Sequence, residues 1–236
     1  PLTSETLLFQ PEFFSQGGFG TFTLKGIGQG TREDNEFLPG LYIAPGTVIS
    51  PVSQSVVGVA YPGGGEGIDL RPAWLPREDR TPVSLNFEAI HVDNRSGVQM
   101  IRGDLVMGEG SLIVTDPLGK VSLKGDTVAV MGSIYAPGGA ISITGASNST
   151  PLFGNPDATD ALTTVYISAN SVLSAAGTVL YDHDPYGRRV GSVLPGGTIA
   201  VAGNIFAEAG AVLDVSGASG TFDLHPSWID PNYIFK

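Results

Sequence analysis

The densest group of ionisable residues in the chain is Asp182-His183-Asp184, followed closely by Arg188. Carboxylate oxygens and imidazole nitrogens can bind metal ions, and the same groups can hydrogen-bond to a sugar. A solvent-exposed loop whose charges pair with one another would contain the same residue types. We therefore treat Asp182, His183, Asp184 and Arg188 as a candidate ligand-binding site with these two interpretations, and we assign no metal site and no cofactor.

A second candidate is the tripeptide Arg102-Gly103-Asp104, the kind of motif that integrins bind. Gly103 and Asp104 align with Gly203 and Asn204 when residues 103–115 are compared with residues 203–215. This alignment predicts that the tripeptide forms a corner where a strand begins. Motifs of three residues are also frequent by chance, so we expect a structural role rather than cell attachment.

Catalytic groups are sparse in the most regular parts of the sequence. Glycoside hydrolysis requires two carboxyl groups that converge on one bond, and serine hydrolases require a serine, a histidine and an acid in contact. The two most regular segments, residues 125–146 and 196–220, contain only Asp126, Glu208 and Asp214 as acids. The three histidines are far apart in the sequence: His91, His183 and His225. We therefore expect a protein that is not an enzyme.

The sequence contains an internal repeat that predicts how these residues are positioned. GDTVAVMGSIYA at 125–136 is similar to GGTIAVAGNIFA at 196–207, and both alternate apolar with small or polar residues before a glycine bend. Alternation with a period of two is typical of strands. Strand repeats that cannot bury an apolar face alone stack into a solenoid. We expect Val130 to stack on Val201 and Ile134 on Ile205, as columns of like residues.

The same alternation predicts strands throughout the chain, with about 20–25 residues per coil and about five or six coils. The predicted strands are 19–24, 41–44, 47–50, 83–87, 104–107, 111–115, 121–124, 127–131, 134–136, 140–144, 164–168, 171–174, 178–181, 198–202, 204–207 and 211–215. Three segments interrupt the pattern and are predicted to be corner insertions: 51–82, 146–162 and 181–196. The expected fold is one all-β solenoid over residues 1–236, a right-handed parallel β-helix.

Composition excludes several classes of function. The formal net charge of −11 argues against binding to nucleic acid or to anionic membranes. There is no cysteine, so neither disulfides nor thiolate metal sites stabilise the fold. The longest apolar runs are too short for a membrane-spanning helix, which needs about 18–20 residues. Because the first residue is Pro1, we expect the chain to be processed or to be a piece of a longer protein.

The segment GGTIAVAGNIFAEAGAVLDVSGASG at 196–220 resembles the filamentous haemagglutinin family of large exoproteins from Gram-negative bacteria. Residues 125–146, 184–197 and 15–26 extend the resemblance. It implies an interior segment of a β-helical shaft, exported by two-partner secretion to the cell surface or the medium. It also implies adhesion or filament formation, with neighbouring coils of the parent chain, other copies end to end, or host glycans and proteins as partners.

Two other functions remain open at this stage. Polysaccharide lyases and glycoside hydrolases also use parallel β-helices, so a carbohydrate-binding or carbohydrate-active protein is an alternative, with the 181–196 insertion overhanging a sugar cleft. A calcium-dependent matrix protein is another alternative, because the glycines of 63–67 resemble part of a calcium-binding nonapeptide. The motif is not repeated, which weakens this second alternative.

Overall fold

The computed structural model of the chain describes residues 6–30, 37–60, 67–92, 102–146 and 163–224. Most of the described strands form three parallel sheets of five strands each. Sheet 1 contains β1 (Thr21–Ile27), β8 (Ser84–Ile90), β11 (Lys120–Lys124), β14 (Ala140–Thr144) and β19 (Thr198–Ala202). Sheet 2 contains β4 (Leu41–Ile43), β9 (Asp104–Met107), β12 (Thr127–Val130), β15 (Val165–Ile167) and β20 (Ile205–Ala207). Sheet 3 contains β5 (Val48–Ile49), β10 (Leu112–Val114), β13 (Ser133–Tyr135), β16 (Val172–Ser174) and β21 (Val212–Asp214).

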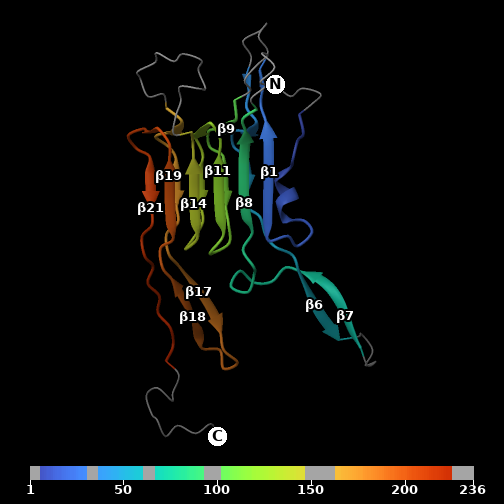
Figure 1. The fold of residues 1–236 in the computed structure, drawn as a ribbon. Helices are drawn as coiled ribbons and strands as arrows, with labels where there is room; N and C mark the ends of the chain where they lie inside the picture. Colours follow the sequence, from blue (N-terminus) through green and yellow to red (C-terminus); the bar gives the residue numbers. More distant parts are fainter. Residues whose placement is uncertain (1–5, 31–36, 61–66, 93–101, 147–162, 225–236) are drawn as a thin grey trace.

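The chain passes through sheets 1, 2 and 3 in turn and then repeats this path. Each coil therefore contributes one strand to every sheet, and Figure 1 shows the strands of sheet 1 side by side from β1 to β19. The third coil, which contains no insertion, begins with β11 at Lys120, and the fourth coil begins with β14 at Ala140. The predicted parallel β-helix is confirmed, with five described coils.

The alternating sequence of each strand explains the arrangement of the core. In β8, Leu85 and Phe87 are buried, whereas Asn86 and Glu88, which alternate with them, face outward. Successive strands pair in register, so one inward column of sheet 1 contains Phe22, Leu85, Val121, Ile141 and Ile199. Burial of each such aliphatic side chain contributes about 1.5–3 kcal/mol. Every coil thus covers the apolar side chains of its neighbour.

The predicted columns of Val130 with Val201 and of Ile134 with Ile205 are wrong. Val130 lies in sheet 2, whereas Val201 lies in sheet 1. Ile134 lies in sheet 3, whereas Ile205 lies in sheet 2. The two copies of the 125–136 repeat therefore occupy different sheets. All three sheets require the same alternation around a bend, so similarity of sequence alone does not identify the sheet.

The weaker repeat, 103–115 with 203–215, matches the structure. Leu105 and Ile205 belong to one column of sheet 2, which they share with Val128 and Val165. Likewise, Ile113 and Leu213 share one column of sheet 3. The two segments occupy equivalent positions in the second and fifth coils.

The insertions leave the stack at its corners. Residues 51–82 include the antiparallel hairpin of β6 (Ser55–Ala60) and β7 (Ile68–Ala73). The predicted insertion 181–196 corresponds to the hairpin of β17 (Thr178–His183) and β18 (Arg189–Leu194), which begins three residues earlier and ends two residues earlier than predicted. Both hairpins follow a strand of sheet 3, and Figure 1 shows them projecting from the same side of the stack. A third pair, β2 (Gln29–Gly30) and β3 (Phe37–Leu38), precedes β4. The 146–162 insertion lies outside the described residues except for Ala146.

A buried ion pair fastens the segment after β7 to the body. Arg80 donates a hydrogen bond from Nη2 to Oδ1 of Asp116 at 2.9 Å, and Asp116 is almost fully buried after β10. Burial raises the pKa of Asp116, and the charge of Arg80 opposes this effect. Nε of Arg77 lies 4.0 Å from the same Oδ1, so two arginines of this segment face one buried carboxylate. Removal of Asp116 would leave Arg80 without its acidic partner, so these contacts tie the segment before β8 to the body.

The two ends of the described stack differ. The 3-10 helix η1 (Pro11–Ser15) lies beside β1, and its Phe14 side chain is only 3% exposed because it packs against Phe22 and Phe87. At the other end, the inward residues Ile205 and Leu213 are each 51% exposed. An aromatic cluster therefore covers the β1 end, while the described residues leave the β19–β21 end open.

This difference predicts opposite outcomes for one substitution at two positions. Val130 is fully buried, so Val130→Asp places an unpaired charge in the core and should lower the free energy of unfolding by about 3–5 kcal/mol. Ile205→Asp introduces the same group at the open end and should cost less than about 1 kcal/mol. Urea unfolding followed by circular dichroism measures both values. Equal losses would contradict the assignment of the two ends.

Candidate functional site

The outward faces of the three sheets differ in chemistry. One outward row of sheet 2 is apolar and aromatic: Tyr42, Val106, Ala129, Tyr166 and Phe206. One outward row of sheet 3 is mostly aliphatic: Val48, Leu112, Ser133, Val172 and Val212. Sheet 1 presents mainly hydroxyl, amide and charged side chains instead. It is the face best suited to hold a polar ligand.

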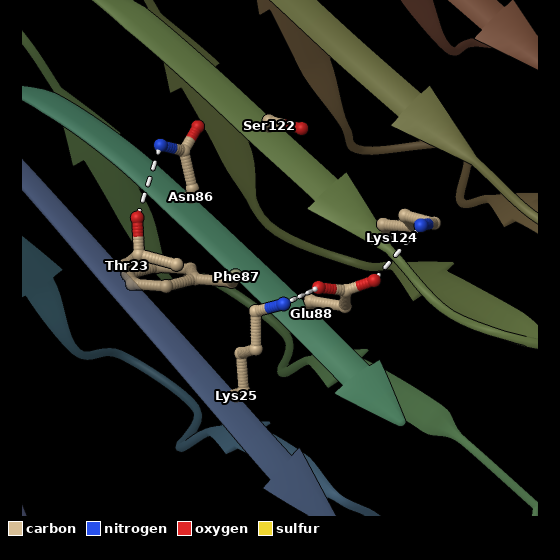
Figure 2. Close-up of a pocket in the computed structure, with 7 residues that line it drawn as sticks. All are labelled: Thr23, Lys25, Asn86, Phe87, Glu88, Ser122 and Lys124. Carbon is tan, nitrogen blue, oxygen red and sulfur yellow. Dashed lines mark hydrogen bonds and ion pairs between the residues drawn. The ribbon is translucent and has the colours of Figure 1, made fainter. Parts of the chain in front are cut away.

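Figure 2 shows a shallow, open depression on the outward face of sheet 1. It crosses β1, β8 and β11, which belong to the first three coils. The lining residues are Thr23, Lys25, Asn86, Phe87, Glu88, Ser122 and Lys124.

Glu88 is the centre of the charged part of this depression. Its Oε2 lies 2.9 Å from Nζ of Lys25, and its Oε1 lies 2.8 Å from Nζ of Lys124 (Figure 2). The three side chains belong to one outward row because Lys25 pairs with Glu88 and Glu88 pairs with Lys124 in the strand register. Hydrogen bonds from Lys124 and Lys25 lower the pKa of Glu88 from 4.5 to about 2.

The neighbouring outward row is uncharged and can form hydrogen bonds. Asn86 donates a hydrogen bond from Nδ2 to Oγ1 of Thr23 at 3.3 Å (Figure 2). Ser122 and Ser142 occupy the same row in the next two coils. Hydroxyl and amide groups can donate and accept, so this row can match the hydroxyl groups of a ligand.

The arrangement favours binding over acid catalysis. A general acid must carry a proton near the working pH, and a carboxyl group with a pKa of about 2 is ionised there. Glu88 therefore contacts both ammonium groups but offsets only one of their two positive charges. The face offers cations and neutral hydrogen-bonding groups, which together can bind a polar anion.

The structure places the sequence-predicted ligand residues at the tip of the β17–β18 hairpin. Asp184 accepts hydrogen bonds from the backbone N–H groups of Tyr186 and Arg188, both at 2.9 Å, and from Nε of Arg188 at 2.7 Å. Desolvation opposes ionisation, but these hydrogen bonds hold the pKa of Asp184 below its ordinary value. Asp184 and Arg188 thus close the turn of the hairpin.

Asp182 and His183 are not brought together into the same site. The backbone N–H of His183 donates to Oδ1 of Asp182 at 2.6 Å, but successive residues of a strand point to opposite faces. The contacts of this hairpin fit the interpretation in which charges pair with one another. Ligand binding by Asp182, His183, Asp184 and Arg188 stays a prediction.

The Arg102-Gly103-Asp104 tripeptide lies at the corner where β9 begins, with Asp104 as the first residue of that strand, as the alignment predicts. Arg102 donates from Nη2 to Oδ1 of Asp104 at 3.0 Å, and the N–H of Gly103 donates to Oδ2 of Asp126 at 2.8 Å. A Cβ atom at Gly103 would collide with the carbonyl oxygen of Ala89, so glycine is required by the close packing of coils. These contacts account for the three residues, and cell attachment through them stays untested.

Among the described residues, no group of three or more histidine, aspartate and glutamate side chains could hold a metal ion. Four of the five residues of the 63–67 glycine motif lie outside the described part of the chain. No helix found in that part is long and apolar enough to cross a membrane.

Comparisons with family models, curated proteins and solved structures gave no match to the chain. The resemblance to filamentous haemagglutinin-family exoproteins therefore stays a prediction from the motifs.

Sequence reasoning missed the lysine and glutamate row of sheet 1. Lys25, Glu88 and Lys124 are far apart in the sequence, and only the register of β1, β8 and β11 aligns them. The sequence did contain a signal for this row. Lys124 ends the predicted strand 121–124, and Lys25 and Glu88 directly follow the predicted strands 19–24 and 83–87. Its recognition required the correct alignment of coils.

The row predicts an unusual titration for Glu88. We expect this carboxyl group to titrate at a pKa of about 2, against an ordinary 4.5, in a pH series followed by carboxyl-carbon NMR. The lysine contacts should stabilise the fold above pH 4.5 and lose this effect as the pH falls towards 2. Lys25→Met with Lys124→Met should raise the pKa towards 4.5. Lys120→Met is the control, and an equal rise there would contradict the assignment.

Proposed function

We propose that the chain is a segment of the rigid shaft of a fibrous exoprotein that extends from a cell and supports adhesion or filament formation, without catalysis. The observation that carries this proposal is the stack of five coils paired in register through three sheets. Each coil contacts its neighbours through backbone ladders and through aliphatic columns. Such a stack is stiff along its axis and can lengthen by repetition.

The open end supports an extended stack. Ile205 and Leu213 occupy inward columns whose members in the previous coil, Val165 and Leu173, are fully buried. An exposed parallel edge with aliphatic side chains favours pairing with another strand. A further coil of the same architecture, from the parent chain, is the occupant that would continue these columns.

Stacking of identical copies from end to end is less favourable in this geometry. Phe13 and Phe14 of η1 pack against Phe22 at the β1 end. A second copy would have to displace this aromatic cluster before its last coil could pair with β1. Two copies could instead associate through their β19–β21 ends, because the described residues leave that end of each copy uncovered.

The resemblance to Gram-negative exoproteins supports export to the outer cell surface or the medium. The absence of cysteine and the acidic charge of −11 are compatible with that location. The two projecting hairpins follow the corners of the first and fourth coils, so they extend from the shaft without interrupting its sheets.

The polar face of sheet 1 favours carbohydrate binding as a second function. Its hydroxyl, amide and lysine side chains suit a glycan. The ionised Glu88 cannot serve as the general acid of glycoside cleavage, and the described strands of sheet 1 present no second outward carboxyl group. Binding and the shaft function are compatible, because a shaft exposes this face along its length.

Antibodies against the purified chain test the surface location. They should label intact, unpermeabilised cells of the source organism, because a shaft is displayed outside the outer membrane. Labelling that appears only after permeabilisation, together with that of a cytoplasmic marker, would contradict the proposal.

The open end predicts concentration-dependent association of the isolated chain, measured by analytical ultracentrifugation. Leu213→Lys should weaken association by at least about tenfold, because the charge disrupts an apolar contact. Leu70→Lys is the matched control: Leu70 is also exposed, but it lies on the β6–β7 hairpin. A monodisperse monomer at high concentration, or equal effects of the two variants, would show that this end does not take a partner.

A further inference from the structure

The lysines of the chain are distributed very unevenly over the structure. The sequence contains four of them: Lys25, Lys120, Lys124 and Lys236. The first three all stand at outward positions of sheet 1, on β1 and β11, and Lys236 lies outside the described residues. Glu88 is the only acidic side chain at an outward position of the described strands of this sheet. A chain with a net charge of −11 thus carries a local surplus of positive charge on one face.

The lysines are accessible although two of them form ion pairs. The side chains of Lys25 and Lys124 are 56% and 60% exposed. Ion pairs at such a surface contribute about 0–1 kcal/mol, so an incoming anion can compete for the ammonium groups. The contacts with Glu88 also hold the two ammonium groups on either side of one coil, which limits the entropy lost on binding.

The spacing of the groups suits an extended, repeating ligand. Neighbouring strands are about 4.8 Å apart, so Lys25 and Lys124 stand on strands about 10 Å apart along the stack. Thr23, Asn86, Ser122 and Ser142 form a parallel row of hydrogen-bonding groups at the same spacing. In the next two coils, the positions in line with Lys25, Glu88 and Lys124 are occupied by the small uncharged residues Thr144 and Ala202. A linear ligand can therefore lie flat across the coils.

We propose that the outward face of sheet 1 binds a linear anionic polysaccharide. Its carboxylate or sulfate groups contact Lys25, Lys120 and Lys124. Its hydroxyl groups hydrogen-bond to the row that contains Thr23, Asn86 and Ser122. This binding site goes beyond the mechanical role of the shaft and is separate from the β17–β18 hairpin.

The chemistry of the face distinguishes this ligand from other polyanions and from a protein. The described strands of sheet 1 present no outward aromatic side chain on which a nucleobase could stack, and three lysines are few for a phosphodiester backbone. The only large apolar side chain that lines the depression is Phe87, which is already buried in the core, so a protein partner would find no apolar side chain to cover there. Hydroxyl and amide groups beside well-separated cations match a sugar polymer that carries spaced anions.

Isothermal titration calorimetry of the purified chain tests the proposal. The titration is done at about 150 mM salt, because attraction between charges more than about 8 Å apart is then largely screened and direct contacts dominate the measured affinity. The probes are polygalacturonate, which carries carboxylates, dextran sulfate, and neutral dextran. The variant Lys25→Gln, Lys120→Gln, Lys124→Gln should weaken binding of the anionic probes by at least tenfold. A matched control is Arg71→Gln, Arg77→Gln, Arg189→Gln, which removes the same charge from exposed positions elsewhere and should bind like the parent.

Each result has a defined meaning. Binding to polygalacturonate, to dextran sulfate or to both, with loss in the lysine variant alone, supports the site and identifies its anion. No binding, equal affinity for neutral dextran, or equal losses in the two variants would overturn it. Circular dichroism confirms that each variant is folded. Failure of this site leaves the surface-labelling result unaffected, so the two proposals fail independently.

Discussion

Alignment of inward side chains between successive coils is the constraint on which this structure depends. A strand whose register slipped by one residue would turn its aliphatic side chains outward and its polar side chains into the core. The columns through Leu85 in sheet 1 and Ile134 in sheet 3 show how little freedom remains, because both side chains are fully buried between their neighbours. Glycines such as Gly103 let the corners approach closely enough for this alignment. The outward faces are free to vary, and each of the three has its own chemistry.

The sequence predicts the strands of the stack well, because the alternation that identifies them is also what buries them. Every strand of the three parallel sheets overlaps a predicted segment, whereas β2, β3, β6, β7 and β18 were missed. These five strands belong to antiparallel pairs outside the three parallel sheets, where pairing is local. In β7 no core imposes alternation, because both Ile68 and Leu70 are exposed. The β1 end was also missed, because the burial of Phe14 depends on contacts with Phe22 and Phe87 that no periodicity predicts.

The candidate site follows the same logic. Density of charge along the sequence drew attention to Asp182–Arg188, and the structure shows that Asp184 and Arg188 mainly close a turn. Lys25, Glu88 and Lys124 form a row only after the coils are stacked. A motif search finds residues that are close in the sequence, but a row on the surface of a β-helix consists of residues from different coils. Prediction of this row requires the correct alignment of the coils. The stronger repeat, 125–136 with 196–207, gives the wrong alignment because its two copies lie in different sheets.

The aromatic cover over the β1 end also makes the two ends of the stack unequal as starting points for folding. A coil that folds beside an apolar surface buries its inward side chains at once, and Phe14 of η1, packed against Phe22 and Phe87, provides such a surface at the β1 end. Folding of a stacked repeat can spread from any coil to its neighbours, and a first coil that formed at the β1 end would offer its open strand edges to the second. During synthesis the amino end emerges first, so the β1 end could fold before the residues of β21 exist, and each added coil would cover the inward side chains of the coil before it.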